Sequence, residues 1–175
     1  PQELDIALMR LSCEHPPTSI GLGKSLSKDL ERWYKWKATL DFKKKLKLLL
    51  EWAWIHDGLP GKVFINKAPA FTTRVDLLLE LFPNSKFIYI ERTYDHVKSI
   101  EKSIKSFNKE FGFIPYLGNA GEDAKFTRSF ILDKWQIIKN IIPKDNLIEV
   151  TYEDLIKTPK KTIDNIKTFT GVSVI

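Results

Sequence analysis

The stretch KFIYIERTYDHVKSIEKS, residues 86–103, decides how the rest of the sequence is interpreted. Its apolar and β-branched residues predict a strand over 86–90, which runs almost directly into Arg92. A helix is predicted over about 94–107, and it carries Ser99 seven positions after Arg92. A strand that ends in a cation and leads into a helix start presents positive charge together with backbone N–H groups. The stretch therefore predicts a binding site for an anion.

Strands and helices alternate along most of the remaining chain. Two more strands are predicted, one at 63–65 and one within NLIEVTY, residues 146–152. Apolar spacing predicts helices at 4–11, at 27–57 as one long helix or a bent pair, at 72–82, at 126–142 and at 160–170. Residues 153–159 read as a short connector, and Gly171 stands where a C-cap glycine belongs. This alternation predicts the α/β class, with a parallel sheet flanked by helices on both faces.

Composition narrows the class of protein. With 175 residues, 43% hydrophobic and 29% charged, the chain is long enough for one domain with its own core. The net charge of +6 suits an anionic ligand, a nucleic acid or an acidic surface, although a merely solvated basic surface is the commonest cause. One cysteine, Cys13, excludes an internal disulfide framework, and three scattered histidines give no zinc spacing, so no metal is expected.

Two features of the sequence concern the cellular location of the protein. The longest mostly apolar stretch, LKLLLEWAWI, is about half as long as a membrane span requires. No signal peptide is visible either, so we expect a reducing, cytoplasmic location and no membrane span. The sequence begins at Pro1 inside an already amphipathic segment, and we expect it to be part of a longer polypeptide.

The segment TSIGLGKS, residues 18–25, ends in Gly-Lys-Ser like a phosphate-binding loop. Its first position is Thr18 rather than glycine, and His15-Pro16-Pro17 precede it where a buried strand should stand. A surface loop accounts for this segment better than a nucleoside triphosphate site does.

Better candidates follow the predicted strands, because ligands of open α/β sheets bind outside the carboxyl ends of the strands. Lys67 follows the first strand, Arg92 the second and Tyr152 the third. Arg92 offers a planar fork for a phosphate, and Ser99 offers a hydroxyl near a helix start. Tyr152 offers a ring face on which a nucleobase can pack, and Lys67 offers a compact positive charge for a leaving oxygen. Each residue alone is more often simply solvated, but the four together favour a nucleotide site.

Three segments together resemble one family. KAPAFTTRVDLLLELFPNSKFIYIER, DHVKS and LIEVTYEDLIKTPKKTIDNIKTFTGV are similar to the sulfotransferases that use 3'-phosphoadenosine 5'-phosphosulfate, over roughly residues 60–172. The resemblance implies a sulfotransferase fold related to P-loop NTPases, incomplete at the N-terminus. It also implies a single domain, 1–175, with a helical insert over 1–60 and a nucleotide-binding core over 61–175.

The resemblance also implies roles for individual residues. Lys67 would lie near the bridging oxygen of the donor, Arg92 and Ser99 would hold the 3'-phosphate, and Tyr152 would lie near the adenine. The sequence departs from the family at three places. The Arg92 to Ser99 spacing is seven rather than eight, Phe71 stands where many relatives have a histidine, and the upstream loop for the 5'-phosphosulfate is missing together with the first strand.

Sulfuryl transfer needs a base as well as cations, and no metal is required in principle. Glu3 is the best remaining base candidate, with His15 and His56 behind it, although an acid in a first helical turn more often only stabilises the helix. Five aromatic residues could line an apolar acceptor pocket but at helical spacing are more often core: Trp33, Tyr34, Trp36, Trp52 and Trp54.

Two functions stay open at this point. One is transfer of a sulfuryl group to a hydroxyl or amine of a small-molecule, glycan or lipid acceptor. The alternative is a family member that binds the nucleotide but is catalytically weak or inactive, which Phe71 and the missing loop favour. A nucleic-acid partner is not expected, because basic runs such as KKKLK read as the solvated face of a helix. The oligomeric state is left open.

Overall fold

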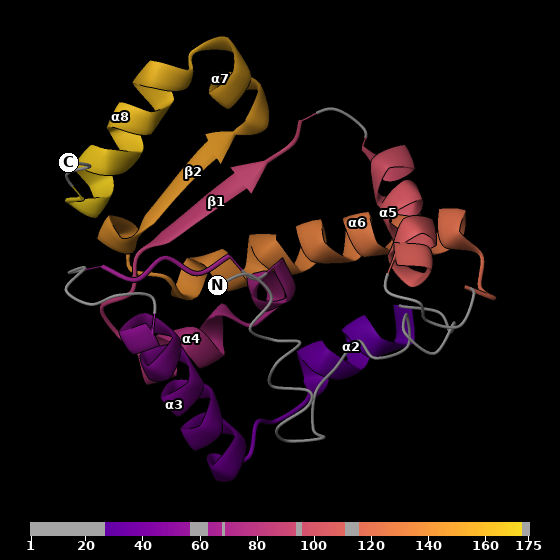
Figure 1. Cartoon of the computed structure of the whole chain (residues 1–175), viewed down its shortest axis with the longest axis horizontal. Coiled ribbons are helices and arrows are strands. Elements are labelled where there is room, and N and C mark those ends of the chain that lie inside the picture. The colour runs from indigo at the N-terminus through magenta and orange to yellow at the C-terminus, as the bar shows by residue number, and fades with distance from the viewer. Residues whose placement is uncertain (1–26, 57–62, 68, 94–95, 111–115, 173–175) are drawn as a thin grey trace.

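The computed structural model describes residues 27–56, 63–67, 69–93, 96–110 and 116–172 (Figure 1). Its sheet consists of two parallel strands, β1 (Phe87–Glu91) and β2 (Leu147–Thr151), which pair in register along all five residues. Two of the three predicted strands, at 86–90 and within 146–152, are confirmed, and so is the α/β class with a parallel sheet.

The chain crosses from β1 to β2 through α5 (Val97–Glu110) and α6 (Ala120–Ile138), followed by two short 3-10 helices, η2 (Lys139–Ile141) and η3 (Lys144–Asn146). Helix α6 begins six residues earlier than the predicted start at 126. The cause is Asn119, whose side chain accepts hydrogen bonds from the N–H groups of Gly121 and Glu122, both at 3.2 Å.

Helix α6 packs against one face of the sheet. The ring of Trp135 stacks on Tyr89 of β1 at 4.0 Å, and its Nε1 donates a 3.0 Å hydrogen bond to Glu149 of β2. On the opposite face Ile88 and Ile90 stay 36% and 50% exposed. The packing of the described residues is therefore much denser on the α6 side of the sheet.

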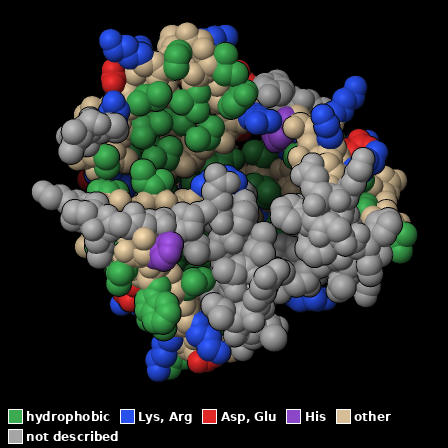
Figure 2. Space-filling view, viewed as in Figure 1, with side chains coloured by type: hydrophobic (Ala, Val, Ile, Leu, Met, Phe, Trp, Pro, Cys, Tyr) green, Lys and Arg blue, Asp and Glu red, His purple; other side chains and the backbone are tan. Residues whose placement is uncertain are grey.

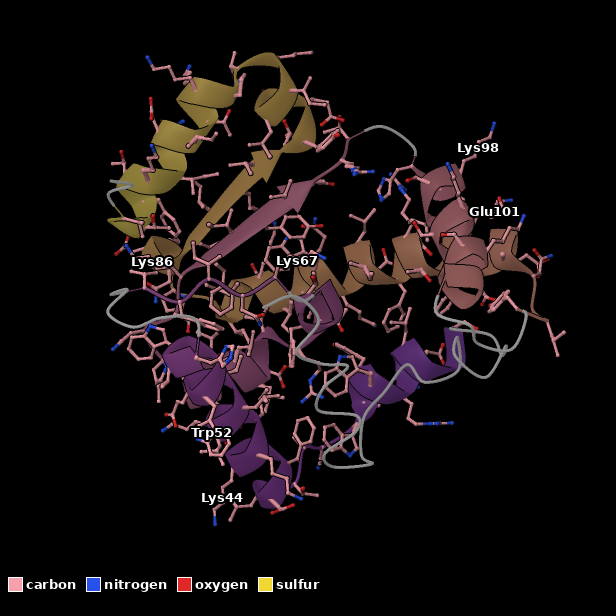
Figure 3. The ribbon with its side chains drawn as sticks, in the orientation of Figure 1. Lys44, Trp52, Lys67, Lys86, Lys98 and Glu101 are labelled. Carbon is pink, nitrogen blue, oxygen red and sulfur yellow. The ribbon has the colours of Figure 1, made fainter. Side chains whose placement is uncertain are left out.

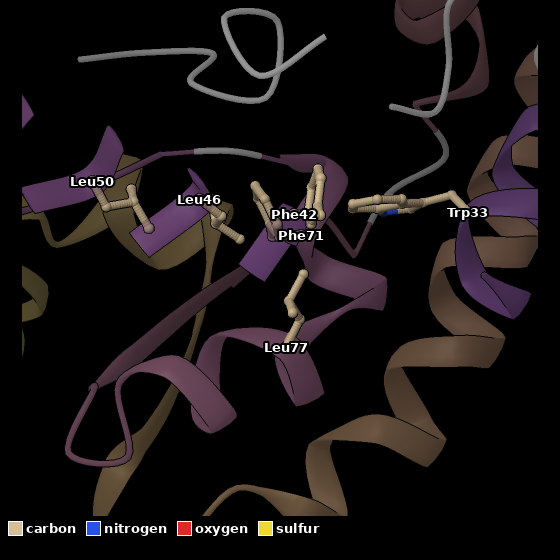
Figure 4. Packing of buried hydrophobic residues seen from close by; sticks show 6 residues of the cluster. All are labelled: Trp33, Phe42, Leu46, Leu50, Phe71 and Leu77. Carbon is tan, nitrogen blue, oxygen red and sulfur yellow. The ribbon is translucent and has the colours of Figure 1, made fainter. Parts of the chain in front are cut away.

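The region predicted as a long helix or a bent pair is a pair, α2 (Ser27–Lys35) and α3 (Leu40–His56). The main core forms where this pair meets the residues that precede β1, and six buried side chains make it up: Trp33, Phe42, Leu46, Leu50, Phe71 and Leu77 (Figure 4). This core joins side chains from both sides of position 60, and the division of the chain there stays a prediction.

One buried cation holds the bend between α2 and α3. Arg74 lies between η1 (Pro69–Thr73) and α4 (Val75–Leu81) and is only 5% exposed. Its Nη1 donates to the carbonyl oxygens of Trp33 and Trp36 at 3.0 and 3.1 Å, and its Nε donates to Asp76 at 3.1 Å. The guanidinium thus satisfies carbonyl groups that the end of α2 leaves unpaired.

The predicted strand at 63–65 is wrong. Residues 63–66 have no regular secondary structure, and only Lys67 forms an isolated β-bridge. Val63 and Ile65 are 50% and 71% exposed. A β-branched run becomes a strand only when a neighbour pairs with its backbone, and among the described residues only β1 and β2 form such a ladder.

Two helices follow β2. The predicted connector over 153–159 contains α7 (Tyr152–Lys157), because Thr151 caps this helix by accepting a 3.0 Å hydrogen bond from the N–H of Asp154. Helix α8 (Pro159–Thr170) ends at Gly171, whose φ of 72° is left-handed, as the predicted C-cap requires.

Replacing Arg74 should destabilise the protein strongly. Arg74→Ala leaves two carbonyl groups and half of an ion pair without their partner, so we expect a loss of about 3 kcal/mol in the free energy of unfolding. Lys43→Ala is the matched control on the same helical region, because Lys43 forms a more exposed ion pair with Glu80 at 2.7 Å. For Lys43→Ala, the loss in the free energy of unfolding should stay below about 1 kcal/mol. Urea unfolding followed by circular dichroism measures both, and equal losses would contradict the role given to Arg74.

Tyr89 makes the free energy of unfolding depend on pH in the alkaline range. Burial raises the pKa of Tyr89 to about 12, and the nearby charges of Glu91 and Glu149 add to this effect. The folded state keeps the phenol neutral while the unfolded chain ionises it near pH 10. Its contribution to stability is therefore complete below about pH 10 and lost between about pH 10 and 12.

The test compares wild type with Tyr89→Phe in urea unfolding at increasing pH. The wild type should lose more stability than the variant on going from pH 9 to pH 11. Parallel losses would show that the phenol does not carry this dependence.

Candidate functional site

The paired strands bring two predicted site residues together at their carboxyl ends. Glu91 and Thr151 form the last register pair, and Arg92 and Tyr152 follow them directly. The Cζ atom of Arg92 lies 4.5 Å from the centre of the Tyr152 ring, which is a cation–π contact. Both side chains are half-buried, so this end of the sheet presents an aromatic face next to a fixed positive charge.

Glu153 joins the turn after β1 to the start of α7. Its carboxylate oxygens accept hydrogen bonds from the backbone N–H of Thr93 at 3.1 and 3.4 Å. This contact fixes the backbone directly after Arg92 next to the residue that follows Tyr152. No role is predicted for Glu153 from the sequence, although the residue stands inside the Tyr-Glu-Asp segment that carries the family resemblance.

Ser99 lies in the first turn of α5, where it is exposed and its backbone N–H donates to the carbonyl of His96 at 2.9 Å. Its neighbour Lys98 is exposed as well and points outward from this end of the helix (Figure 3). Residues 94–95 lie outside the described residues. The joint action of Arg92 and Ser99 on one phosphate therefore stays a prediction.

Lys67 ends the segment that leads into η1 and is exposed (Figure 3). Because it belongs to a single bridge and not to a strand of the sheet, its predicted place at the same edge as Arg92 stays a prediction.

Buried polar atoms without a hydrogen-bond partner occur at four described residues near η1 and on α6: Asn66 Oδ1, Thr73 Oγ1, Thr127 Oγ1 and Arg128 Nε. Helices η1 and α6 pack against each other, and such atoms are uncommon unless a ligand or water completes them.

The position where many relatives have a histidine holds a core residue. Phe71 is 3% exposed and meets the Trp33 ring edge-on at 5.8 Å. No proton can be accepted there. The other base candidates, Glu3 and His15, lie outside the described residues, and His56 is exposed at the end of α3.

The five aromatic residues that were predicted to line a pocket or to form core differ in how far they are buried. Trp33 is buried and stacks on Trp36 at 5.6 Å, which agrees with a core role. Tyr34 is half-buried against Phe130 of α6. Trp52 and Trp54 are 65% and 39% exposed, so the core interpretation is wrong for them.

Among the described residues, no group of three histidine, cysteine, aspartate or glutamate side chains is placed to hold a metal ion. None of the described helices has both the length and the apolar character needed to cross a membrane.

Comparisons with known proteins agree with this picture of the fold. The family model described as "Sulfotransferase family" matches residues 26–175. Among solved structures, the "Sulfotransferase Domain from the Curacin Biosynthetic Pathway" aligns with a TM-score of 0.53 and 17% sequence identity, covering 92% of this chain and 65% of that one. No curated protein matches. At this identity the structural likeness shows the fold alone, but the family model spans most of the sequence, and the chain belongs to the sulfotransferase family.

Proposed function

We propose that the chain binds 3'-phosphoadenosine 5'-phosphosulfate and transfers its sulfuryl group to a hydroxyl or amine of an acceptor. Membership of the sulfotransferase family supports the type of reaction. The observation that carries the choice of donor is the contact of Arg92 with Tyr152 at the carboxyl ends of two paired parallel strands. That edge is where α/β sheets bind nucleotides.

In this proposal, the two residues of the pair recognise different parts of the donor. Arg92 holds the 3'-phosphate with two parallel N–H donors, and Ser99 adds a hydroxyl. Tyr152 packs its ring against the adenine. Glu153 positions the pair, since it ties the backbone after Arg92 to the start of α7. The exposed Lys98 raises the positive potential at the same turn.

Lys67 is the proposed cation for the leaving oxygen. In sulfuryl transfer, the bond from sulfur to the bridging oxygen breaks, a bond from sulfur to the acceptor oxygen or nitrogen forms, and the acceptor proton passes to a base. An ammonium near the bridging oxygen stabilises the negative charge that develops there. The unpaired polar atoms of Asn66, Thr73 and Thr127 support a polar ligand in this region.

A second candidate function is nucleotide binding with weak or no transfer. The burial of Phe71 favours it, because the position where many relatives have a histidine cannot supply a base here. For the first candidate function, sulfuryl transfer, Glu3 remains the proposed base. The proposed acceptor is a small molecule, a glycan or a lipid, and we propose no nucleic-acid partner.

A transfer assay tests the proposed function. The full-length polypeptide, given donor labelled with ³⁵S and a panel of phenols, sugars and lipids, should label at least one acceptor. Lys67→Ala should lower the rate about a hundredfold, the usual loss when one group that stabilises developing charge is removed. Lys144→Ala is the control, because this lysine is exposed in η3, outside the proposed site. Nucleotide binding without transfer to any acceptor would favour the second candidate, and neither binding nor transfer would refute both.

Arg92 should control affinity for the 3'-phosphate. Arg92→Ala should weaken binding of 3'-phosphoadenosine 5'-phosphate about thirtyfold, or about 2 kcal/mol, because a charge-assisted contact is lost. Arg92→Lys should recover only part of this, since an ammonium has no planar fork. Ser99→Ala should cost about 1 kcal/mol. Calorimetry measures each variant.

Adenosine 5'-phosphosulfate, which lacks the 3'-phosphate, provides the control ligand. Wild type and Arg92→Ala should bind it alike. If the substitution weakens both nucleotides equally, Arg92 supports the fold through Tyr152 and does not recognise the 3'-phosphate.

A further inference from the structure

Helix α3 is apolar on two opposite faces. One face carries Phe42, Leu46 and Leu50 into the core. The other carries Leu48, Trp52 and Ile55, which are 50%, 65% and 57% exposed. Since positions three and four apart share one side of a helix, these residues form a continuous stripe, which we call the outer stripe. Side chains this large rarely form an exposed patch without a partner.

The outer stripe lies beside positive charge. Lys44 stands one turn before Leu48 on the same side of α3, and Figure 3 shows it pointing away from the rest of the molecule. Of the four lysines of this helix, Lys43, Lys45 and Lys47 form ion pairs with Glu80, Asp41 and Glu51, so Lys44 supplies the positive charge nearest the stripe. In Figure 2, the lower edge of the molecule shows hydrophobic side chains next to Lys and Arg, with Asp and Glu side chains among them. A partner for this surface therefore needs an apolar layer bordered by negative charge.

We propose that the outer stripe binds the surface of an anionic lipid membrane. Leu48, Trp52 and Ile55 enter the boundary between headgroups and acyl chains, and Lys44 remains among the lipid phosphates. The tryptophan ring suits this boundary because it is apolar with one polar N–H. The association is peripheral, with α3 lying along the surface while its inner face stays in the protein core. This proposal is independent of the proposed sulfuryl transfer.

Three observations favour a membrane over a second copy of the chain. The net charge of +6 opposes self-association and favours an anionic surface. Helix α3 lies at the margin of the molecule (Figure 1), and the exposed residues of the stripe share one side of it, so a flat surface can reach all of them. Facing two copies of the stripe would also bring the Lys44 side chains of both copies close together, and the repulsion between like charges costs free energy.

Vesicle flotation with the full-length polypeptide tests the proposal. The protein should float with vesicles of phosphatidylcholine and phosphatidylglycerol, and much less with phosphatidylcholine alone. The triple variant Leu48→Ser, Trp52→Ser, Ile55→Ser should bind at least about tenfold more weakly, because three apolar side chains no longer enter the lipid. Lys44→Glu should weaken binding at low salt and have less effect at high salt.

The matched control is a triple serine variant at Leu117, Ile137 and Ile141, which are 81%, 58% and 51% exposed elsewhere on the molecule. It should bind like wild type, and circular dichroism confirms that each variant is folded. Trp52→Phe should still float but lose most of the blue shift in tryptophan emission on adding vesicles.

Three outcomes would overturn the proposal. The first is no binding to the anionic vesicles. The second is equal loss of binding in the outer-stripe and control variants. The third is a concentration-dependent dimer that the outer-stripe variant abolishes while vesicles bind neither protein, since the stripe would then be a contact between copies.

Discussion

The position of the proposed site depends on one side chain, Trp135. Its ring stacks on Tyr89 and its N–H bonds to Glu149, and these two residues are register partners on β1 and β2. A slip of one residue in either strand would move Tyr89 or Glu149 to the opposite face of the sheet. Trp135 therefore fixes the register of a sheet too short to fix it through backbone hydrogen bonds alone. Lys139 strengthens the same point through its 3.3 Å contact with Glu149.

The register determines which residues meet at the carboxyl ends of the strands. Because Glu91 pairs with Thr151, the next residues are neighbours, and the guanidinium of Arg92 reaches the ring of Tyr152. Glu153 then holds the turn after β1. The bend between α2 and α3 depends on a comparable constraint, the buried guanidinium of Arg74. Trp135 thus contacts both strands of the sheet, and Arg74 joins the end of α2 to the start of α4.

Features that depend on local chemistry could be predicted from the sequence. The apolar runs that became β1 and β2 and the glycine that ends α8 are of this kind, whereas the sequence left open whether α2 and α3 form one long helix or a bent pair. The segment at 63–65 has the composition of a strand, but strand formation depends on a partner that its own sequence does not specify. Glu153 was missed because its role comes from a contact with Thr93, sixty residues earlier in the chain. Periodicity could not assign Trp52 either, since α3 is apolar on both faces.

The residues proposed to bind the nucleotide and the lysine proposed to act in transfer are positioned by different parts of the fold. The positions of Arg92 and Tyr152 follow from the strand register, whereas Lys67 lies two residues before η1, which packs against α6. Phe71 belongs to the second region, and its burial stabilises the core while removing a base from that position. Under the proposed function, substitutions there should change the rate of transfer without altering the residues proposed to recognise the nucleotide. This separation gives a physical reason why a family member with Phe71 could keep donor binding whether or not another residue, such as Glu3, supplies the base.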